Sequence, residues 1–376
     1  MFIVFLVVFI DLLGFGIVLP LLPRYSTTYM GVLPASLRGA ALGILFSIFS
    51  LMQFVFSPMW GRMSDRIGRR PVLLIGLAGS VVFYGLFGIA SNISSELSWL
   101  ALGLLFLSRL GAGVAGASVS SAAAVIADCT TPEKRAKGMA LIGAAFGIGF
   151  TFGPLIGYLG LTMFDQAHWA PGAMASLLSF GALLLAIRLL PETRRPGTAP
   201  ANKVLFSLSR TMEVLRMPTI GALVLIYFLV IFAFANFEGT LSMFTASAFK
   251  LNDEDNFLVF SYVGLVLMVA QGGFYRRFAG KASEERLLSI GIGMMFLGLA
   301  GLAAVAWMAG EGKNAAGLQV SFYCSLAAAV FGFAFVNPSV SALVSKRSDP
   351  GRQGEVLGVN QSFAALGRIL GPLIGL

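Results

Sequence analysis

Long apolar runs, each bounded by polar or charged residues, dominate this sequence. Eleven of them have about the 20 residues that an α-helix needs to cross the hydrocarbon core of a bilayer. They cover residues 2–23, 39–60, 71–91, 98–127, 137–160, 169–190, 218–245, 256–276, 286–309, 318–344 and 355–376. Because 57% of the residues are hydrophobic and only 11% are charged, a water-soluble fold could not bury this much apolar surface. The sequence therefore predicts an all-α polytopic membrane protein.

The basic residues are concentrated in every second loop. Of the 26 Lys and Arg residues, 20 lie in loops 61–70, 133–137, 188–216, 276–286 and 346–352. Positive residues favour the cytoplasmic side of a membrane, so these loops and the amino terminus are predicted to be cytoplasmic. We expect a multi-pass protein of the plasma membrane, which is the inner membrane if the source is bacterial. The net charge of +9 is then a signal of topology, and no nucleic-acid partner is expected because no basic face alternates with aromatic residues.

An internal repeat divides the chain into two halves. The pentapeptide GPLIG at residues 153–157 recurs at residues 371–375, an offset of 218. The same offset relates Pro132 to Pro350, and each proline precedes a basic loop that leads into the repeated run. Many membrane carriers are built from such repeats. The repeat therefore favours a carrier.

The polar, basic segment after the sixth run is expected to be a linker between the halves. The predicted organisation is an amino-terminal six-helix bundle at 1–190, a cytoplasmic linker at 191–217 and a carboxy-terminal bundle at 218–376. By the repeat, residue 376 corresponds to residue 158 of the first half. We therefore expect the carboxy-terminal bundle to be truncated to five helices, with the twelfth helix missing from this chain.

Few residues suit enzyme chemistry. His168 is the only histidine, which nearly excludes catalytic triads and metal sites built from several histidines. Cys129 and Cys324 have no metal-ligand spacing and are expected to be core residues. No phosphate-binding Walker loop is present, so energy for transport would come from an ion gradient. We expect no enzyme activity, no cofactor and no metal.

The loop GRMSDRIGRR at residues 61–70 has the spacing G-x-x-x-D-R-x-G-R-R. It resembles the signature loop between the second and third helices of the major facilitator superfamily. The segments DLLGFGIVLPLLP, RLGAGVAGASVSSAAAVIAD and GIGFTFGPLIGY, and the Pro-Glu-Thr after the sixth run, resemble drug:proton antiporters of the tetracycline-efflux type. The second half is similar to the tetracycline-transporter-like branch of animals. Two positions depart from the family pattern, Ala112 and Tyr158.

The resemblance implies the major facilitator fold, in which two pseudo-symmetric six-helix bundles rock about a central site, here with eleven helices present. It also implies a gating loop that holds the halves together when the cytoplasmic side is closed. Its residues would be Gly61, Asp65, Arg66, Gly68, Arg69, Arg70 and Asp128. In the family, the acid matching Asp65 contacts the start of the eleventh helix, and the basic residues pair with the acid that matches Asp128.

Ionisable residues inside the apolar runs are candidates for proton coupling, because a charge at that depth is costly and is a functional-site hypothesis by default. They are Asp11, Arg109 and Glu238. The resemblance places Asp11 and Arg109 on neighbouring helices beside a central cavity. The structural alternatives are a locked ion pair for Asp11, a tether for Arg109, and for Glu238 a pairing with Arg368.

Polar side chains within the runs are candidates for the substrate cavity, although most such residues join helices instead. They are Gln53, Asn236, Gln271, Asn337, Gln361 and Arg368. The fifth run carries the family's antiporter segment, with Gly149, Gly153, Pro154 and Gly157. Those glycines also form a stripe that suits helix packing.

The predicted function is proton-coupled antiport, in the direction of efflux, of a small organic molecule by alternating access. One alternative is a proton-coupled symporter that imports a nutrient or metabolite, and another is a membrane receptor or scaffold that transports nothing. The expected partners are a small-molecule substrate, protons and the lipid bilayer, and the chain is expected to be a monomer. The sequence does not specify the substrate.

Overall fold

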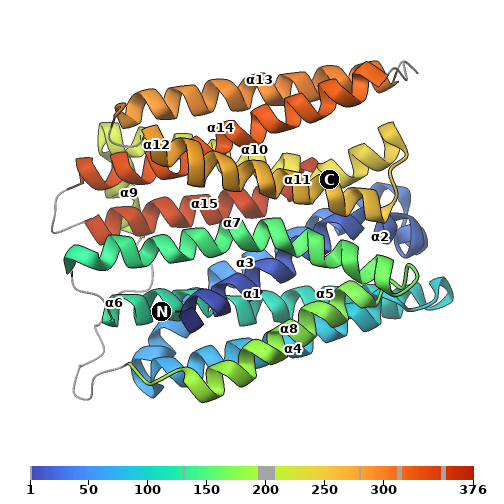
Figure 1. Cartoon of the computed structure of the whole chain (residues 1–376), viewed down its shortest axis with the longest axis horizontal. Coiled ribbons are helices and arrows are strands. Elements are labelled where there is room, and N and C mark those ends of the chain that lie inside the picture. The colour runs from blue at the N-terminus through green and yellow to red at the C-terminus, as the bar shows by residue number, and fades with distance from the viewer. Residues whose placement is uncertain (1, 130–131, 194–207, 279–280, 311–315, 349–352) are drawn as a thin grey trace. The chain divides into compact units, whose positions relative to one another are not determined.

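The structure is a computed structural model that describes residues 2–129, 132–193, 208–278, 281–310, 316–348 and 353–376. Each of the eleven expected spans coincides with one helix or with two or three successive helical segments (Figure 1). Eight helical segments in the described residues are long and apolar enough to cross a membrane. The all-α architecture predicted from the apolar runs is therefore confirmed.

The chain divides into two compact units. The first contains residues 1–203, the short stretch 252–261 and residue 376, and the second contains residues 204–251 and 262–375. The helices of the first unit are α1 (Phe2–Val18), η1 (Leu19–Leu21), α2 (Leu22–Thr28), η2 (Met30–Val32), α3 (Ala35–Ile67), α4 (Arg69–Ser91), η3 (Ser95–Leu97), α5 (Ser98–Gly116), α6 (Val119–Asp128), α7 (Pro132–Met163) and α8 (Ala170–Leu189). Of the expected linker, residues 194–207 lie outside the described part.

The second unit holds most of the remaining helices, and α11 begins in the first unit and ends in the second. They are α9 (Leu208–Arg216), α10 (Pro218–Phe249), α11 (Asp253–Val269), η4 (Ala270–Tyr275), α12 (Arg276–Phe278), α13 (Glu284–Gly310), α14 (Ala316–Arg347) and α15 (Gln353–Gly375). The segment η4 is π-helical, and such wide turns often occur at functional sites. It lies at the end of an expected span and contains Gln271.

Local sequence explains where several helices begin and end. Proline is tolerated in the first turn of a helix because its missing N–H would be unpaired there, and α10 begins at Pro218. The same helix ends at Phe249, and the following residue, Lys250, adopts the left-handed conformation with φ 56°. Helix α7 continues through Pro154.

Small residues bring neighbouring helices into close contact. In the second unit, α13 and α14 run side by side (Figure 1), and a Cβ at Gly298 would lie 2.2 Å from the backbone nitrogen of Ala329. In the first unit, a Cβ at Gly172 on α8 would lie 2.5 Å from the backbone nitrogen of Gly88 on α4. Such close approach is typical of helices packed within a membrane.

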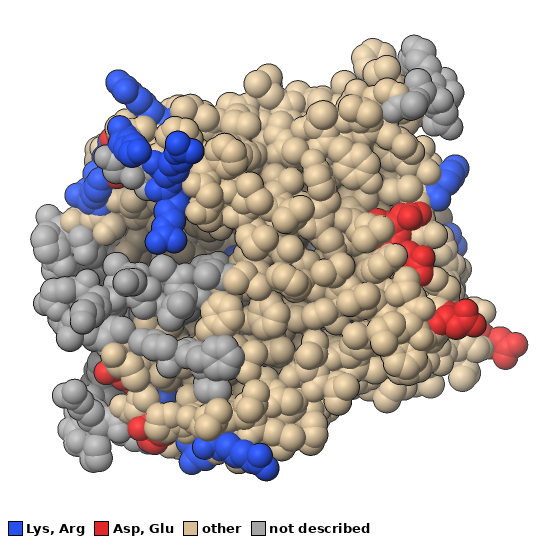
Figure 2. Space-filling view, in the orientation of Figure 1, with Lys and Arg blue, Asp and Glu red and all other residues tan. Residues whose placement is uncertain are grey.

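The surface agrees with a membrane environment. On the face in Figure 2, the charged side chains gather near helix ends, and the surface between them is uncharged. Large apolar side chains such as Leu177, Phe296 and Trp307 are exposed along the helices. Lipid would cover such side chains in a bilayer.

The expectation that both cysteines belong to the core is wrong. Cys129 and Cys324 are exposed. Cys129 directly follows the last residue of α6, where the helix reaches its connecting loop, and Cys324 lies on α14. In a membrane helix an apolar position need not be an interior position, because lipid is an apolar solvent, so hydropathy alone did not distinguish the two.

Candidate functional site

The connection between α3 and α4 is a single glycine. Gly68 separates the two helices and has φ 110° and ψ 159°, a conformation that is essentially restricted to glycine. A Cβ at this position would also lie 2.4 Å from a carboxylate oxygen of Glu192. Gly68 therefore allows the chain to turn directly from α3 into α4 while Glu192 approaches the turn.

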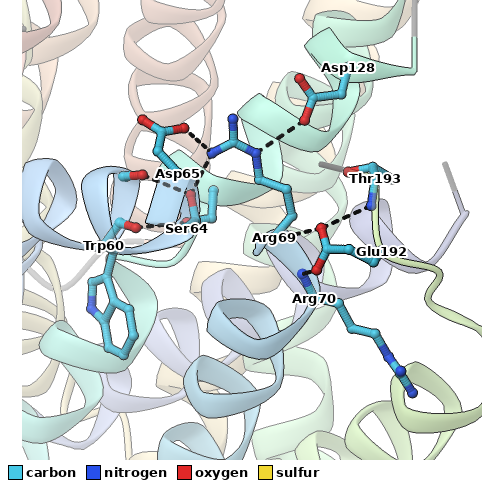
Figure 3. Close-up of polar contacts among 10 residues, drawn as sticks. Trp60, Ser64, Asp65, Arg69, Arg70, Asp128, Glu192 and Thr193 are labelled. Carbon is cyan, nitrogen blue, oxygen red and sulfur yellow. Dashed lines mark hydrogen bonds and ion pairs between the residues drawn. The ribbon is translucent and has the colours of Figure 1, made fainter. Parts of the chain in front are cut away.

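The guanidinium of Arg69 lies at the centre of a polar network beside this turn (Figure 3). Its Nη1 is 2.5 Å from Asp65 Oδ1 and donates to Ser64 Oγ at 2.7 Å, while its Nε donates to Asp128 Oδ2 at 3.1 Å. The Arg69 side chain is only 13% exposed, against 33% for Asp65 and 31% for Asp128. The arginine therefore joins α3, α4 and α6 through largely shielded contacts.

Glu192 binds the same turn from the end of α8. Its Oε1 accepts the backbone N–H of Arg69 at 2.9 Å, and its Oε2 accepts that of Arg70 at 3.1 Å (Figure 3). These N–H groups belong to the first turn of α4, which has no partners for them within the helix. A carboxylate is favourable there because the amino-terminal end of a helix carries a partial positive charge.

The role of Glu192 was missed from the sequence. The Pro-Glu-Thr segment was recognised as a shared feature, but a partner 123 residues away is not visible in a pattern. The useful signal was an acid directly after the sixth span, on the side where the basic loops gather.

Two further contacts support the network. The guanidinium of Arg70 donates to the backbone oxygen of Ile187 on α8 at 2.6 Å. The indole of Trp60 on α3 donates to the backbone oxygen of Val114 on α5 at 2.6 Å. Of the other expected gating residues, Gly61 accepts a hydrogen bond from Ser64 at 2.8 Å, and Arg66 is exposed.

Arg109 is the largest of the fully buried side chains in the described residues. It lies on α5 with 2% of its surface exposed, and its guanidinium carbon is 4.6 Å from the centre of the Phe49 ring. Gly113 brings α3 close to this point, since a Cβ there would lie 2.5 Å from the backbone oxygen of Phe49. A glycine at position 113 therefore allows α3 and α5 to approach closely beside Arg109.

Helix α1 passes the same region. Leu13 and Ile17 of α1 belong to one buried cluster with Phe49 of α3 and Ala112 of α5. Asp11 lies on α1, two residues before Leu13. The side chain of Asp11 is outside the described part of the structure, so its predicted role remains a prediction.

Helix α7 carries the expected antiporter segment and packs closely on α1. A Cβ at Gly153 would lie 2.6 Å from the backbone oxygen of Leu13, and a Cβ at Gly16 would lie 3.1 Å from Pro154 Cδ. Gly149 and Gly157 are also buried. The predicted role in helix packing is thus confirmed at Gly153, and the role of the segment in transport remains a prediction.

The second unit has its own buried acid. Glu238 on α10 is 7% exposed, and its Oε1 has no hydrogen-bond partner among the described residues. Arg368 on α15 is half-buried and interacts electrostatically with Glu238. No ion pair within 4.0 Å joins them in the described structure.

The other polar candidates differ in their surroundings. Asn337 accepts a hydrogen bond from the hydroxyl of Tyr227 at 2.8 Å, and the Asn236 amide donates to the backbone oxygen of Gly371 at 3.2 Å. These bonds join helices. Gln53 packs on Gly116, Gln271 is half-buried in η4, and Gln361 is exposed.

Comparisons with known proteins agree with this architecture. The sequence model described as Major Facilitator Superfamily matches residues 4–372. The chain is 31% identical to Major facilitator superfamily domain-containing protein 10 of Homo sapiens, over 99% of this chain and 85% of that protein. It is 32% identical to the Tetracycline resistance protein, class G, of Vibrio anguillarum, over 98% of this chain and 87% of that protein.

A solved structure shows the same fold. The crystal structure of the human organic anion transporter MFSD10 (TETRAN) matches with a TM-score of 0.69 and 29% sequence identity, covering 99% of this chain and 91% of that one. The helices, the loop network and the two relatives therefore point to one family. This chain belongs to the major facilitator superfamily.

Proposed function

We propose that this protein is a secondary active transporter that exports a small organic molecule in exchange for protons. In this mechanism the two helical bundles expose the binding site to each side of the membrane in turn. Asp11, Arg109 and Glu238 are assigned to proton coupling, and the network around Arg69 to the gate.

The observation that carries the proposal is the burial of the Arg109 guanidinium in α5, next to the helix that bears Asp11. A charge inside a membrane span is costly, and residues that bear such charges commonly serve ion or substrate pathways. A nearby cation lowers the proton affinity of a carboxylate, so the affinity would change whenever the distance between the two groups changed. That response is what exchange of a proton for a substrate requires.

Relatives support the direction and the kind of substrate. One relative is named for tetracycline resistance, and another for transport of organic anions. The second name describes transport of small organic molecules, and the resistance to a drug in the first name is consistent with export. We therefore take tetracycline and the organic anion fluorescein as probes.

Reconstitution of the full chain into proteoliposomes would test this. Vesicles would contain a pH-sensitive dye, and each probe would be supplied as a gradient across the membrane. We expect protons to move opposite to the probe, and an imposed pH gradient to drive probe transport. Proton movement in the same direction as the probe would identify a symporter, and probe transport without proton movement would overturn coupling.

Variants separate the coupling residues from general effects. Asp11→Asn and Arg109→Gln are expected to abolish proton-driven transport, while Asp165→Asn is a matched control. Asp165 is exposed and has φ 50°, a conformation that asparagine tolerates. Full proton-driven transport by Asp11→Asn would remove Asp11 from the mechanism.

A further inference from the structure

Polar side chains in the second unit fall into two groups. Tyr227, Asn337 and Asn236 use their polar atoms in hydrogen bonds between helices. By contrast, Oε1 of Glu238 and Oγ of Ser242 are buried without a hydrogen-bond partner among the described residues. These two residues are four positions apart and so share one face of α10. That face therefore carries hydrogen-bonding capacity that the described structure does not use.

Arg368 supplies a positive charge on the helix that packs against α10. A Cβ at the preceding Gly367 would lie 3.0 Å from the backbone oxygen of Phe228, which shows how closely α15 approaches α10. Arg368 lies near Glu238 of the facing helix. Even so, no hydrogen bond or ion pair holds its guanidinium in the described structure.

The separation of these two charges is the informative feature. Removing a carboxylate or a guanidinium from water is unfavourable, and a direct, well-oriented pair would offset much of that cost. Glu238 and Arg368 interact with each other yet do not form such a pair. A ligand with a positive group next to Glu238 and a negative group next to Arg368 would give each charge a partner.

Aromatic rings accompany the acid. Phe234, one helical turn before Glu238, stacks on Phe333 with ring centres 3.7 Å apart, and it also contacts Phe237 with ring centres 5.7 Å apart. Aromatic rings attract cations through their π faces and favour flat apolar groups. Rings one helical turn from Glu238 therefore favour a ligand whose charged groups are attached to an apolar or aromatic body.

We propose that Glu238 and Arg368 form a subsite for a zwitterionic ligand, with its ammonium group on Glu238 and its carboxylate on Arg368. This inference rests on the antiport proposed above and specifies its substrate class. In an exchanger, the proton and the substrate compete for the same carboxylate. Only a ligand with a cationic group competes with a proton for Glu238, whereas Arg368 selects an anionic group.

Four compounds of similar size and shape test this class. They are the zwitterion 4-(aminomethyl)benzoate, the anion 4-methylbenzoate, the cation 4-methylbenzylamine and the neutral 4-methylbenzyl alcohol. Binding to the full chain in detergent micelles would be measured by calorimetry. We expect the zwitterion to bind at least about tenfold more tightly than each of the others, because it alone satisfies both charges.

Variants assign each charge to its residue. In Arg368→Gln, the zwitterion is expected to bind only as tightly as 4-methylbenzylamine. In Glu238→Gln, it is expected to bind only as tightly as 4-methylbenzoate. The exposed Arg276→Gln and Glu96→Gln are controls that change no affinity. Should either site variant fail to fold, Arg368→Lys and Glu238→Asp keep the charge and are expected to retain the preference for the zwitterion.

Several results would overturn the inference. They are no binding of the zwitterion, equal binding of the zwitterion and the anion, or unchanged affinity in the folded Arg368→Gln or Glu238→Gln variants. These results are distinguishable from a failure of antiport. Proton exchange with the anion fluorescein, without a preference for the zwitterion, would leave antiport intact and overturn the subsite. Zwitterion binding without proton exchange would support the subsite and overturn antiport.

Discussion

The carboxylate of Glu192 accepts the backbone N–H of Arg69 at 2.9 Å, across 123 residues of sequence. This bond ties the segment after α8 to the first turn of α4. The Arg69 side chain is held separately, by Asp65 and Asp128. The loop between α3 and α4 is thus fixed both through its backbone and through its side chains.

Glu192→Ala is expected to lower the free energy of unfolding by about 1 kcal/mol, because two N–H groups at the start of α4 lose their acceptor and the helix end loses a favourable charge. Glu192→Gln is expected to have a smaller effect, since the amide retains one acceptor oxygen. Denaturant unfolding of the purified protein in micelles would measure both. Glu96→Gln, which changes an exposed acid, is the control, and an equal loss in that variant would contradict this role of Glu192.

Gly68→Ala is expected to destabilise the protein by about 1–3 kcal/mol, because the backbone conformation excludes a side chain and the new Cβ would collide with Glu192. Gly103→Ala on α5 is the matched control, since a Cβ there meets nothing within 4 Å. The same unfolding experiment would compare them. If Gly68→Ala were as stable as Gly103→Ala, the turn described between α3 and α4 would be wrong.

Gly153→Ala tests the close approach of α7 to α1. The new Cβ would lie 2.6 Å from the backbone oxygen of Leu13, so the helices must separate. We expect a loss of about 1–3 kcal/mol in stability, the usual range for overpacking. Gly147→Ala is a control on the same helix, since its Cβ has open space. Equal thermal midpoints for the two variants would argue against this contact.

Because Tyr25 is buried, we expect the free energy of unfolding to fall at alkaline pH. This residue follows the first expected span, is fully buried, and its hydroxyl lies 3.0 Å from Ser91 Oγ. Burial raises the pKa of Tyr25 well above its usual value. The folded state therefore keeps the proton as the pH rises above about 10, while the unfolded state releases it. Stability is fully present below that pH and falls above it.

Two variants isolate this effect from the hydrogen bond. Tyr25→Phe and Ser91→Ala both remove the bond between the side chains, but only Tyr25→Phe removes the ionisable group. Between pH 9 and pH 11, a range of about two units around the usual tyrosine pKa, the stability of Tyr25→Phe is expected to fall less steeply than that of Ser91→Ala. Parallel curves for the two variants would exclude Tyr25 as the cause.

Sequence reasoning predicted part of the candidate site. The resemblance of residues 61–70 to the family's signature loop singled out Asp65 and Arg69 and implied that Asp128 pairs with the basic residues, and the structure contains the ion pair between Arg69 and Asp128. Glu192 and Trp60 were missed, because each acts on a backbone group far away in sequence. Hydropathy marked Asn236 and Arg368 alike, although their surroundings differ.

By itself, the sequence determined the class of fold, because a backbone in a membrane must satisfy its own hydrogen bonds, and continuous apolar runs of about 20 residues have the length of a spanning helix. It also indicated the family, because the loop at residues 61–70 resembles the signature loop of that family. Only the tertiary structure decided which polar atoms meet. Hydrogen bonds depend on distances of a few tenths of an ångström, and helix packing sets those distances between residues such as Glu192 and Arg69.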